Sequence, residues 1–189
     1  PAIFAPIPAA AIRPSPALWP AAGSRLRGAE LEIAFRIDAP LPPADAADFL
    51  PRLAAAVTPL PAFEILDSRL QDPRNAAPLR VLADSQMNAG LVCGAASDGR
   101  WQPADFDRPD VFLKAGDSVL CAGPASLPGG TPFALLAELV CRCGDHCGGL
   151  QPGQIVTTGS FTGMHFFAAG ATVSGRIAGL TPLSVTFAD

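Results

Sequence analysis

The stretch AELEIAFRI at residues 29–37 decides the fold of this chain. Apolar and charged residues alternate along it, with Leu31 and Ile33 on one parity and Glu30 and Glu32 on the other. Alternation with a period of two is typical of a strand whose two faces meet different surroundings. The pattern predicts a strand that packs one face on a core and presents two carboxylates together on the other.

The segments around this strand predict further short strands and few helices. Asp45 is placed to cap a helix over residues 46–56, which Pro59 and Pro61 are expected to end. A second helix is predicted over residues 131–143, with Pro132 near its start and Gly144 directly after its end. The predicted strands are residues 62–67, 89–94, 154–158, 171–177 and 183–187, with a hairpin over 111–122 that turns at 115–117 and a loop over 70–79. Mixed short strands with few helices indicate an α+β fold.

Composition favours a folded domain that binds a small molecule. Of the 189 residues, 49% are hydrophobic, and the formal net charge is -4 with 13 Lys plus Arg. The mean hydropathy of +0.31 argues against a disordered chain, and the few basic residues argue against a nucleic-acid or anionic membrane surface. We find no apolar run near the roughly 18 residues that a membrane-spanning helix needs. The cytosol is the expected compartment, because five cysteines at uneven spacing do not suit a disulfide framework.

Three glutamates form the candidate functional group. Glu30 and Glu32 are two residues apart on a predicted strand, so both side chains point to one face. Glu64 is surrounded by apolar neighbours in PAFEIL, where an unpaired charge is costly. Three carboxylates suit Mg²⁺ or Mn²⁺. The alternative is that Glu30 and Glu32 lie on a solvated face and that Glu64 pairs with an arginine.

Four blocks of the sequence resemble the fumarylacetoacetate hydrolase superfamily, in its 2-keto-4-pentenoate hydratase and oxalocrotonate decarboxylase branch. GAELEIAFRI is similar to the stretch in which two glutamates bind metal, and PAFEILDSR to the segment with the third. LADSQMNAG and GQIVTTGSFTG resemble two later blocks, and all four occur in the family order. The resemblance implies a mixed β-roll or barrel core with a few flanking helices, and it favours the metal interpretation of the glutamates.

The resemblance also implies roles for the other candidate residues. Arg69 is expected to pair with the substrate carboxylate or to neutralise Asp67, and Asp84 belongs to the third block. In the family context, the turn after the 154–158 strand offers N–H groups and a hydroxyl to a substrate oxygen, whereas the residues alone favour an ordinary strand-ending turn. His165 is either a group at the pocket mouth or a structural residue. The expected metal ligands are Glu30, Glu32 and Glu64, the other catalytic candidates are Arg69 and Asp84, and the expected substrate contacts are Thr158, Gly159, Ser160 and His165.

The activity that this branch implies is a metal-dependent lyase. It would hydrate a 2-hydroxy-2,4-dienoate, the tautomer of a 2-oxo-4-pentenoate-type acid, to a 4-hydroxy-2-oxo acid in aromatic catabolism. The metal would act as a Lewis acid on the 2-oxygen during enol–keto tautomerisation. A 2-oxo-3-hexenedioate decarboxylase and a non-catalytic metal-binding relative are the alternatives. By analogy with the family, a homo-oligomer is expected.

Some positions depart from the family pattern. The family places a lysine upstream of the first glutamates, whereas the lysine of this chain is Lys114, far from the motif blocks. Ser85 and Gln154 stand where the family commonly has Asn and Asp. PAIFAPI resembles the segment that follows this lysine block, and the chain begins without methionine. We therefore expect that an upstream segment is absent from this chain or that the natural protein lacks it. The expected organisation is a proline-rich extension over residues 1–28 that leads into a catalytic domain over 29–189.

The cysteines near the second helix invite a zinc interpretation. CRCGDHC places Cys141, Cys143, His146 and Cys147 close together, but their spacing is not that of a zinc pair. Buried thiols at a helix C-terminus are the favoured explanation.

Overall fold

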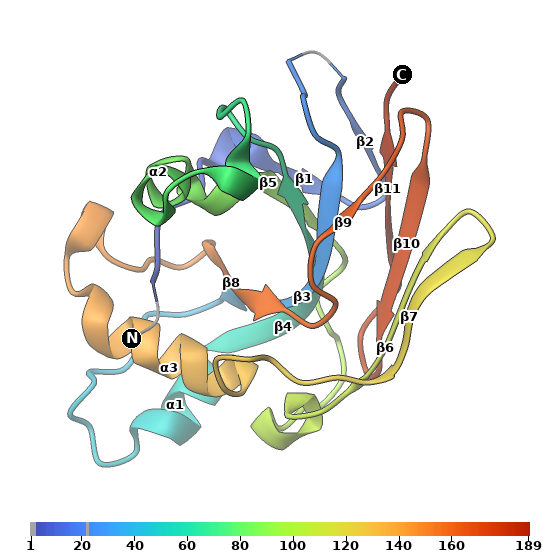
Figure 1. The fold of residues 1–189 in the computed structure, drawn as a ribbon. Coiled ribbons are helices and arrows are strands. Elements are labelled where there is room, and N and C mark those ends of the chain that lie inside the picture. The colour runs from blue at the N-terminus through green and yellow to red at the C-terminus, as the bar shows by residue number, and fades with distance from the viewer. Residues whose placement is uncertain (1–2, 22) are drawn as a thin grey trace.

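The computed structural model describes residues 3–21 and 23–189, and these form two facing β-sheets with helices to one side (Figure 1). The first sheet has the order β1 (Ile12–Pro14), β5 (Asn88–Cys93), β4 (Val57–Leu66), β3 (Gly28–Ile37) and β8 (Ile155–Ser160), and β9 (His165–Phe166) also pairs with β3. The second has the order β2 (Ala17–Trp19), β11 (Leu183–Phe187), β10 (Thr172–Ile177), β6 (Asp110–Ala115) and β7 (Ser118–Pro124). The α-helices are α1 (Phe49–Ala55), α2 (Pro78–Ala83) and α3 (Pro132–Cys143), and short 3-10 helices lie at Ala9–Ala11, Pro73–Asn75, Ser85–Met87, Pro103–Phe106 and His146–Gly148. The predicted α+β β-roll is confirmed.

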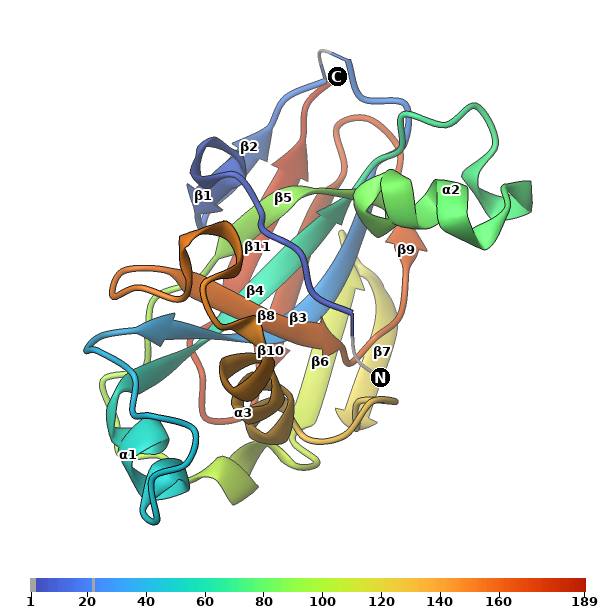
Figure 2. The same cartoon turned by 90° about the vertical axis from the view of Figure 1, so that its left-hand side faces the viewer.

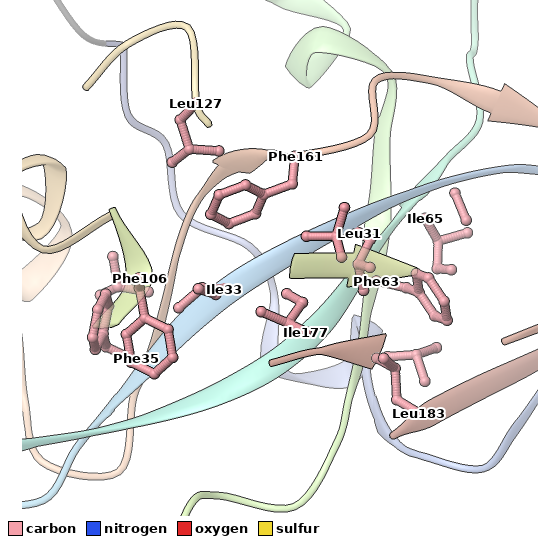
Figure 3. Close-up of a cluster of buried hydrophobic side chains, with 14 of the residues drawn as sticks. Leu31, Ile33, Phe35, Phe63, Ile65, Phe106, Leu127, Phe161, Ile177 and Leu183 are labelled. Atoms are coloured by element: carbon pink, nitrogen blue, oxygen red, sulfur yellow. The ribbon is translucent and has the colours of Figure 1, made fainter. Parts of the chain in front are cut away.

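The main hydrophobic core lies between the two sheets (Figure 3). Leu31, Ile33 and Phe35 of β3 are fully buried in it, as their spacing predicts. Ile177 of β10 faces them from the second sheet. Burying each side chain of this size stabilises the fold by about 1.5–3 kcal/mol. The other face of β3 is thereby left to its carboxylates.

The segment before β3 joins the edges of both sheets. β1 pairs in parallel with β5 of the first sheet, and β2 pairs in parallel with β11 of the second. Ser15 fastens the link between them, since its Oγ accepts from the Ser184 N–H at 2.8 Å. These short strands contain or adjoin prolines, so the sequence pattern did not predict them as strands.

The prediction that Pro59 and Pro61 end the first helix is wrong. α1 ends at Ala55, and both prolines lie inside β4. Their carbonyl oxygens accept from the N–H groups of Ser97 and Gly94 at 2.9 and 2.8 Å, so the missing N–H groups point away from β3. At this end β4 has passed the end of β5, and the pairing of β4 with β3 continues unbroken over the prolines.

The second predicted helix is confirmed as α3. The Thr131 hydroxyl accepts from the Ala134 N–H at 3.3 Å, and Gly144 follows the helix with φ 53°. The expectation of buried thiols at its end is wrong, because Cys141 and Cys147 are exposed. The buried residues of α3, which include Phe133 and Leu136, lie in its first half. None of the helices in the described ranges is long and apolar enough to span a bilayer.

Gly175 of β10 lets the two sheets approach each other. A Cβ at this position would lie 2.8 Å from both Leu31 Cδ1 and Phe63 Cζ. We predict that Gly175→Ala lowers the free energy of unfolding by roughly 1–3 kcal/mol through overpacking, measured by urea denaturation. Gly99→Ala is the control, because its Cβ would meet nothing closer than 3.7 Å. Equal stability of the two variants would contradict close packing at Gly175.

Candidate metal centre

Strands β3 and β4 bring three carboxylates together on the face of the first sheet that lies away from the core. Glu30 is directly opposite Glu64 in the antiparallel register, and Glu32 follows two residues along on the same face. One oxygen of each carboxylate lies within 4.8 Å of the others. Glu32 is only 1% exposed, whereas Glu30 and Glu64 are half-buried. Figure 2 shows this side of the sheet, with the N-terminal segment crossing in front of it.

Each carboxylate receives a hydrogen bond from a different group. The Gly159 N–H donates to Glu32 Oε2 at 3.2 Å, and Asn88 Nδ2 donates to Glu64 Oε1 at 2.7 Å. The Ser160 hydroxyl is the hydrogen-bond partner of Glu30. These neutral donors come from β8 and β5, the strands that flank the β3–β4 pair. They orient the carboxylates without neutralising them.

The metal-free centre is electrostatically unfavourable. Burial and the charge of Glu64 raise the pKa of Glu30 to about 7, although the hydrogen bond from Ser160 opposes the shift. Burial, followed by the charges of Glu64 and Glu30, raises the pKa of Glu32 well above its usual range, against the opposing Gly159 N–H. Across residues 3–21 and 23–189, no ion pair involves any of these carboxylates.

A hard divalent cation fits this donor set. The ligand atoms are carboxylate oxygens, which suit Mg²⁺, Mn²⁺ or Ca²⁺. A bound cation would also supply the positive charge that the surrounding side chains lack. The alternative interpretation of a solvated face fails, because Glu32 is buried and Glu64 is bonded to Asn88 rather than to an arginine.

Arg69 and Asp84 lie together in residues 67–87, the segment that joins β4 to β5 and is called the arm below. Arg69 Nε forms an ion pair with buried Asp84, and the Ser68 hydroxyl donates to the same carboxylate at 2.7 Å. Asp67 is not the partner of Arg69, since it accepts from backbone N–H groups that include that of Leu26 at 2.8 Å. The Arg69 side chain therefore forms its ion pair within the arm that carries it.

The residues expected to contact substrate lie on β8 and β9, which both pair with β3. β8 continues through Gly159 and Ser160, so the predicted turn is the end of a strand. The buried Thr158 hydroxyl donates to the Ile33 carbonyl at 2.8 Å, which fixes β8 against β3. His165 pairs with Ala29, beside Glu30 in the chain, and its Nε2 lies 3.1 Å from the Thr162 carbonyl oxygen.

Asn88 was missed as a site residue by the sequence analysis. It lies in the block LADSQMNAG, but an asparagine at the start of a predicted strand shows no preference for a site. Its role follows from the β4–β5 pairing, which places the start of β5 beside the Glu64 end of β4.

Comparison with known proteins identifies the fold. No family model and no curated protein matches the chain. Among solved structures, 4-oxalocrotonate decarboxylase from Pseudomonas putida G7, complexed with magnesium and adipate, matches at 22% identity with a TM-score of 0.73 over 94% of this chain. The chain has the fold of the fumarylacetoacetate hydrolase superfamily. The predicted resemblance is thus confirmed for the fold, and the chain spans 66% of the length of that decarboxylase.

Two further matches have other activities in their names. A 2-hydroxyhepta-2,4-diene-1,7-dioate isomerase from Mycobacterium marinum matches at 17% identity and a TM-score of 0.64, over 94% of this chain and 65% of its own. A fumarylpyruvate hydrolase from Pseudomonas aeruginosa in complex with Mn²⁺ and pyruvate matches at 17% identity and a TM-score of 0.63, over 96% and 76%. The same fold is therefore found in proteins named for different reactions.

The raised pKa of Glu30 predicts how the stability of the metal-free protein depends on pH. The folded state holds this proton more tightly than the unfolded state, whose pKa is near 4.5, so the stabilisation is complete below that pH. It is lost as the pH rises through about 7. We expect a loss of about 2 kcal/mol after allowance for solvent screening, measured by urea denaturation in EDTA at pH 4.5 and pH 8.

The control for this pH dependence is Glu30→Gln, which should remove the part of the loss that Glu30 causes, while the part that the raised pKa of Glu32 causes remains. A wild-type stability that rises from pH 4.5 to pH 8 would contradict the assigned electrostatics.

The buried charge of Glu32 makes a second prediction. Replacement by the neutral isostere in Glu32→Gln should raise the free energy of unfolding of the metal-free protein by about 1–3 kcal/mol at pH 8, because a repelled carboxylate is removed. The same variant should lose the stabilisation that Mn²⁺ gives the wild type. Both effects are measured by urea denaturation with EDTA or Mn²⁺. Glu138→Gln on the surface of α3 is the matched control, and a Glu32→Gln protein that Mn²⁺ still stabilises fully would refute the ligand assignment.

Proposed function

We propose that this chain belongs to a divalent-metal-dependent lyase of the fumarylacetoacetate hydrolase superfamily, which hydrates a 2-hydroxy-2,4-dienoate or 2-oxo-4-pentenoate-type acid. The observation that supports this most strongly is the triad of Glu30, Glu32 and Glu64, each with its own hydrogen-bond donor and none in an ion pair with another described residue. Mg²⁺ or Mn²⁺ is the proposed cofactor. The named magnesium and manganese complexes of two fold relatives agree with a divalent ion.

The chemistry of the substrate fits such a centre. A 2-oxo acid presents its carboxylate and 2-oxygen as two adjacent hard donors, and the cation, when bound, supplies Lewis-acid charge for enol–keto interconversion. Glu30, Glu32 and Glu64 would hold the cation. Gly159 and Ser160 would fix the orientation of two of these carboxylates and border the substrate, while Thr158 holds their strand in place.

Other residues are proposed to act at the border of the site. The proposed substrate contact of His165 lies near the start of β3, although the strand register places its half-buried side chain on the face of Ala29 and not on that of Glu30. Arg69 and Asp84 would support the arm over the site through their ion pair. Assembly into a homo-oligomer is part of the proposal for the intact protein.

A decarboxylase of 2-oxo-3-hexenedioate is the second candidate. It is favoured by the match to 4-oxalocrotonate decarboxylase, whose TM-score of 0.73 exceeds those of the isomerase and the hydrolase above. Hydration and decarboxylation both begin from a 2-oxo-enoate, so the same metal centre would serve either. The two differ in product, because only decarboxylation releases CO₂.

A binding-only relative is the third candidate, and it follows from Lys114. This lysine lies on β6 in the second sheet, whereas the triad is on the first. A lysine near the substrate, which the family resemblance implies, is thus not supplied by Lys114.

The experiment that tests the function follows the dienol absorbance of freshly prepared 2-hydroxypenta-2,4-dienoate in the presence of Mg²⁺ or Mn²⁺. We expect metal-dependent loss of absorbance with solvent oxygen incorporated at C4, and at least a hundredfold slower loss with Glu32→Gln. Glu138→Gln should retain the wild-type rate. Release of CO₂ from 2-oxo-3-hexenedioate without hydration of the dienoate would replace the hydratase with the decarboxylase, and Mn²⁺ binding without turnover of either acid would favour the binding-only relative.

A further inference from the structure

The turn that leads into Asn88 has an unusual backbone. Ser85, Gln86 and Met87 have φ of 53°, 53° and 71°, in the left-handed region that side chains other than glycine rarely adopt. Three such residues in succession need tertiary contacts to hold them. The turn ends at Asn88, the first residue of β5. The conformation of the turn therefore sets the position of the Asn88 backbone, from which its side chain projects.

Arg69 bridges the two ends of this turn. Its Nη2 donates to the Asp84 carbonyl oxygen before the turn, and its Nη1 donates to the Asn88 carbonyl oxygen after it at 3.1 Å. Its Nε pairs with the Asp84 side chain, which the Ser68 hydroxyl also holds. A planar guanidinium can make these contacts at the same time, whereas an ammonium group cannot reproduce the arrangement.

Asn88 connects this turn to the proposed metal centre through a side-chain hydrogen bond to Glu64. Its amide donates to Glu64 Oε1 at 2.7 Å, which leaves Oε2 of the same carboxylate without this donor. Groups that hydrogen-bond to metal ligands orient them, and their removal commonly weakens metal binding by 10–100-fold.

We propose that Arg69 and Asn88 form one positioning unit for Glu64, in which Arg69 fixes the 84–88 turn and Asn88 orients the carboxylate. The inference rests on the metal site proposed above. Arg69 then acts through Asn88 on a metal ligand and does not bind the substrate carboxylate. The ion pair with Asp84 supports the bridge between the two carbonyl oxygens.

Isothermal titration calorimetry with Mn²⁺ tests this unit without relying on activity. We expect Asn88→Ala and Arg69→Lys each to weaken Mn²⁺ binding by about tenfold or more. The double variant should be little weaker than either single variant, since both changes interrupt one path. Asn75→Ala and Arg80→Lys are matched controls on the same arm, because both residues are exposed and neither contacts the triad. They should bind Mn²⁺ as the wild type does.

The outcomes separate this inference from the proposed function. Wild-type affinity in Asn88→Ala, or multiplication of the two losses in the double variant, would overturn the positioning unit alone. Absence of Mn²⁺ binding to the wild type would overturn the metal site as well. Thermal unfolding in EDTA establishes that each variant is folded. Asn88→Leu, which keeps nearly the size of the side chain but loses its donor and adds no charge, must also weaken binding if Asn88→Ala does not fold.

Discussion

The pairing of Glu30 with Glu64 across two antiparallel strands is the constraint on which the rest of the site depends. Adjacent strands place opposite side chains about 5 Å apart, and like charges in that position repel. With Glu32 two residues away on the same face, the repulsion is shared by three carboxylates, one of them almost fully buried. The strand register that gathers these three carboxylates is therefore a register that costs the protein stability when no cation is bound.

The surrounding structure lowers this cost without removing it. Gly159, Ser160 and Asn88 each offer a neutral donor to one carboxylate, and none brings a positive charge. A lysine or arginine in place of a donor would relieve part of the repulsion and would compete with a cation. Neutral donors thus keep the carboxylates ordered without supplying a positive charge, and the packed core on the other face of β3 stabilises the fold against the remaining repulsion.

The sequence predicted the β3 strand, the 111–122 hairpin and α3 well, because each has a strong local signal. Alternation marks β3, a Gly-Asp turn marks the hairpin, and Pro132 with Gly144 marks the ends of α3. It also predicted that the three glutamates lie together, through periodicity for Glu30 and Glu32 and through family resemblance for Glu64. The sequence did not predict the role of Asn88 or the partners of Arg69. Their contacts depend on which strands are neighbours and on a left-handed turn that contains no glycine. The exposed thiols were missed for a similar reason, since helical periodicity does not tell which end of α3 reaches past the core.

The prolines of β4 have a consequence for how the strands find each other. In the observed alignment, the ring nitrogens of Pro59 and Pro61 point away from β3. A slip of one residue would turn both nitrogens toward β3, remove two hydrogen bonds from the ladder and carry Glu64 to the apolar side. Misaligned pairings are therefore penalised twice, once in the backbone and once by burying a charge. The two prolines that were predicted to end a helix therefore favour the strand register that aligns Glu64 with Glu30.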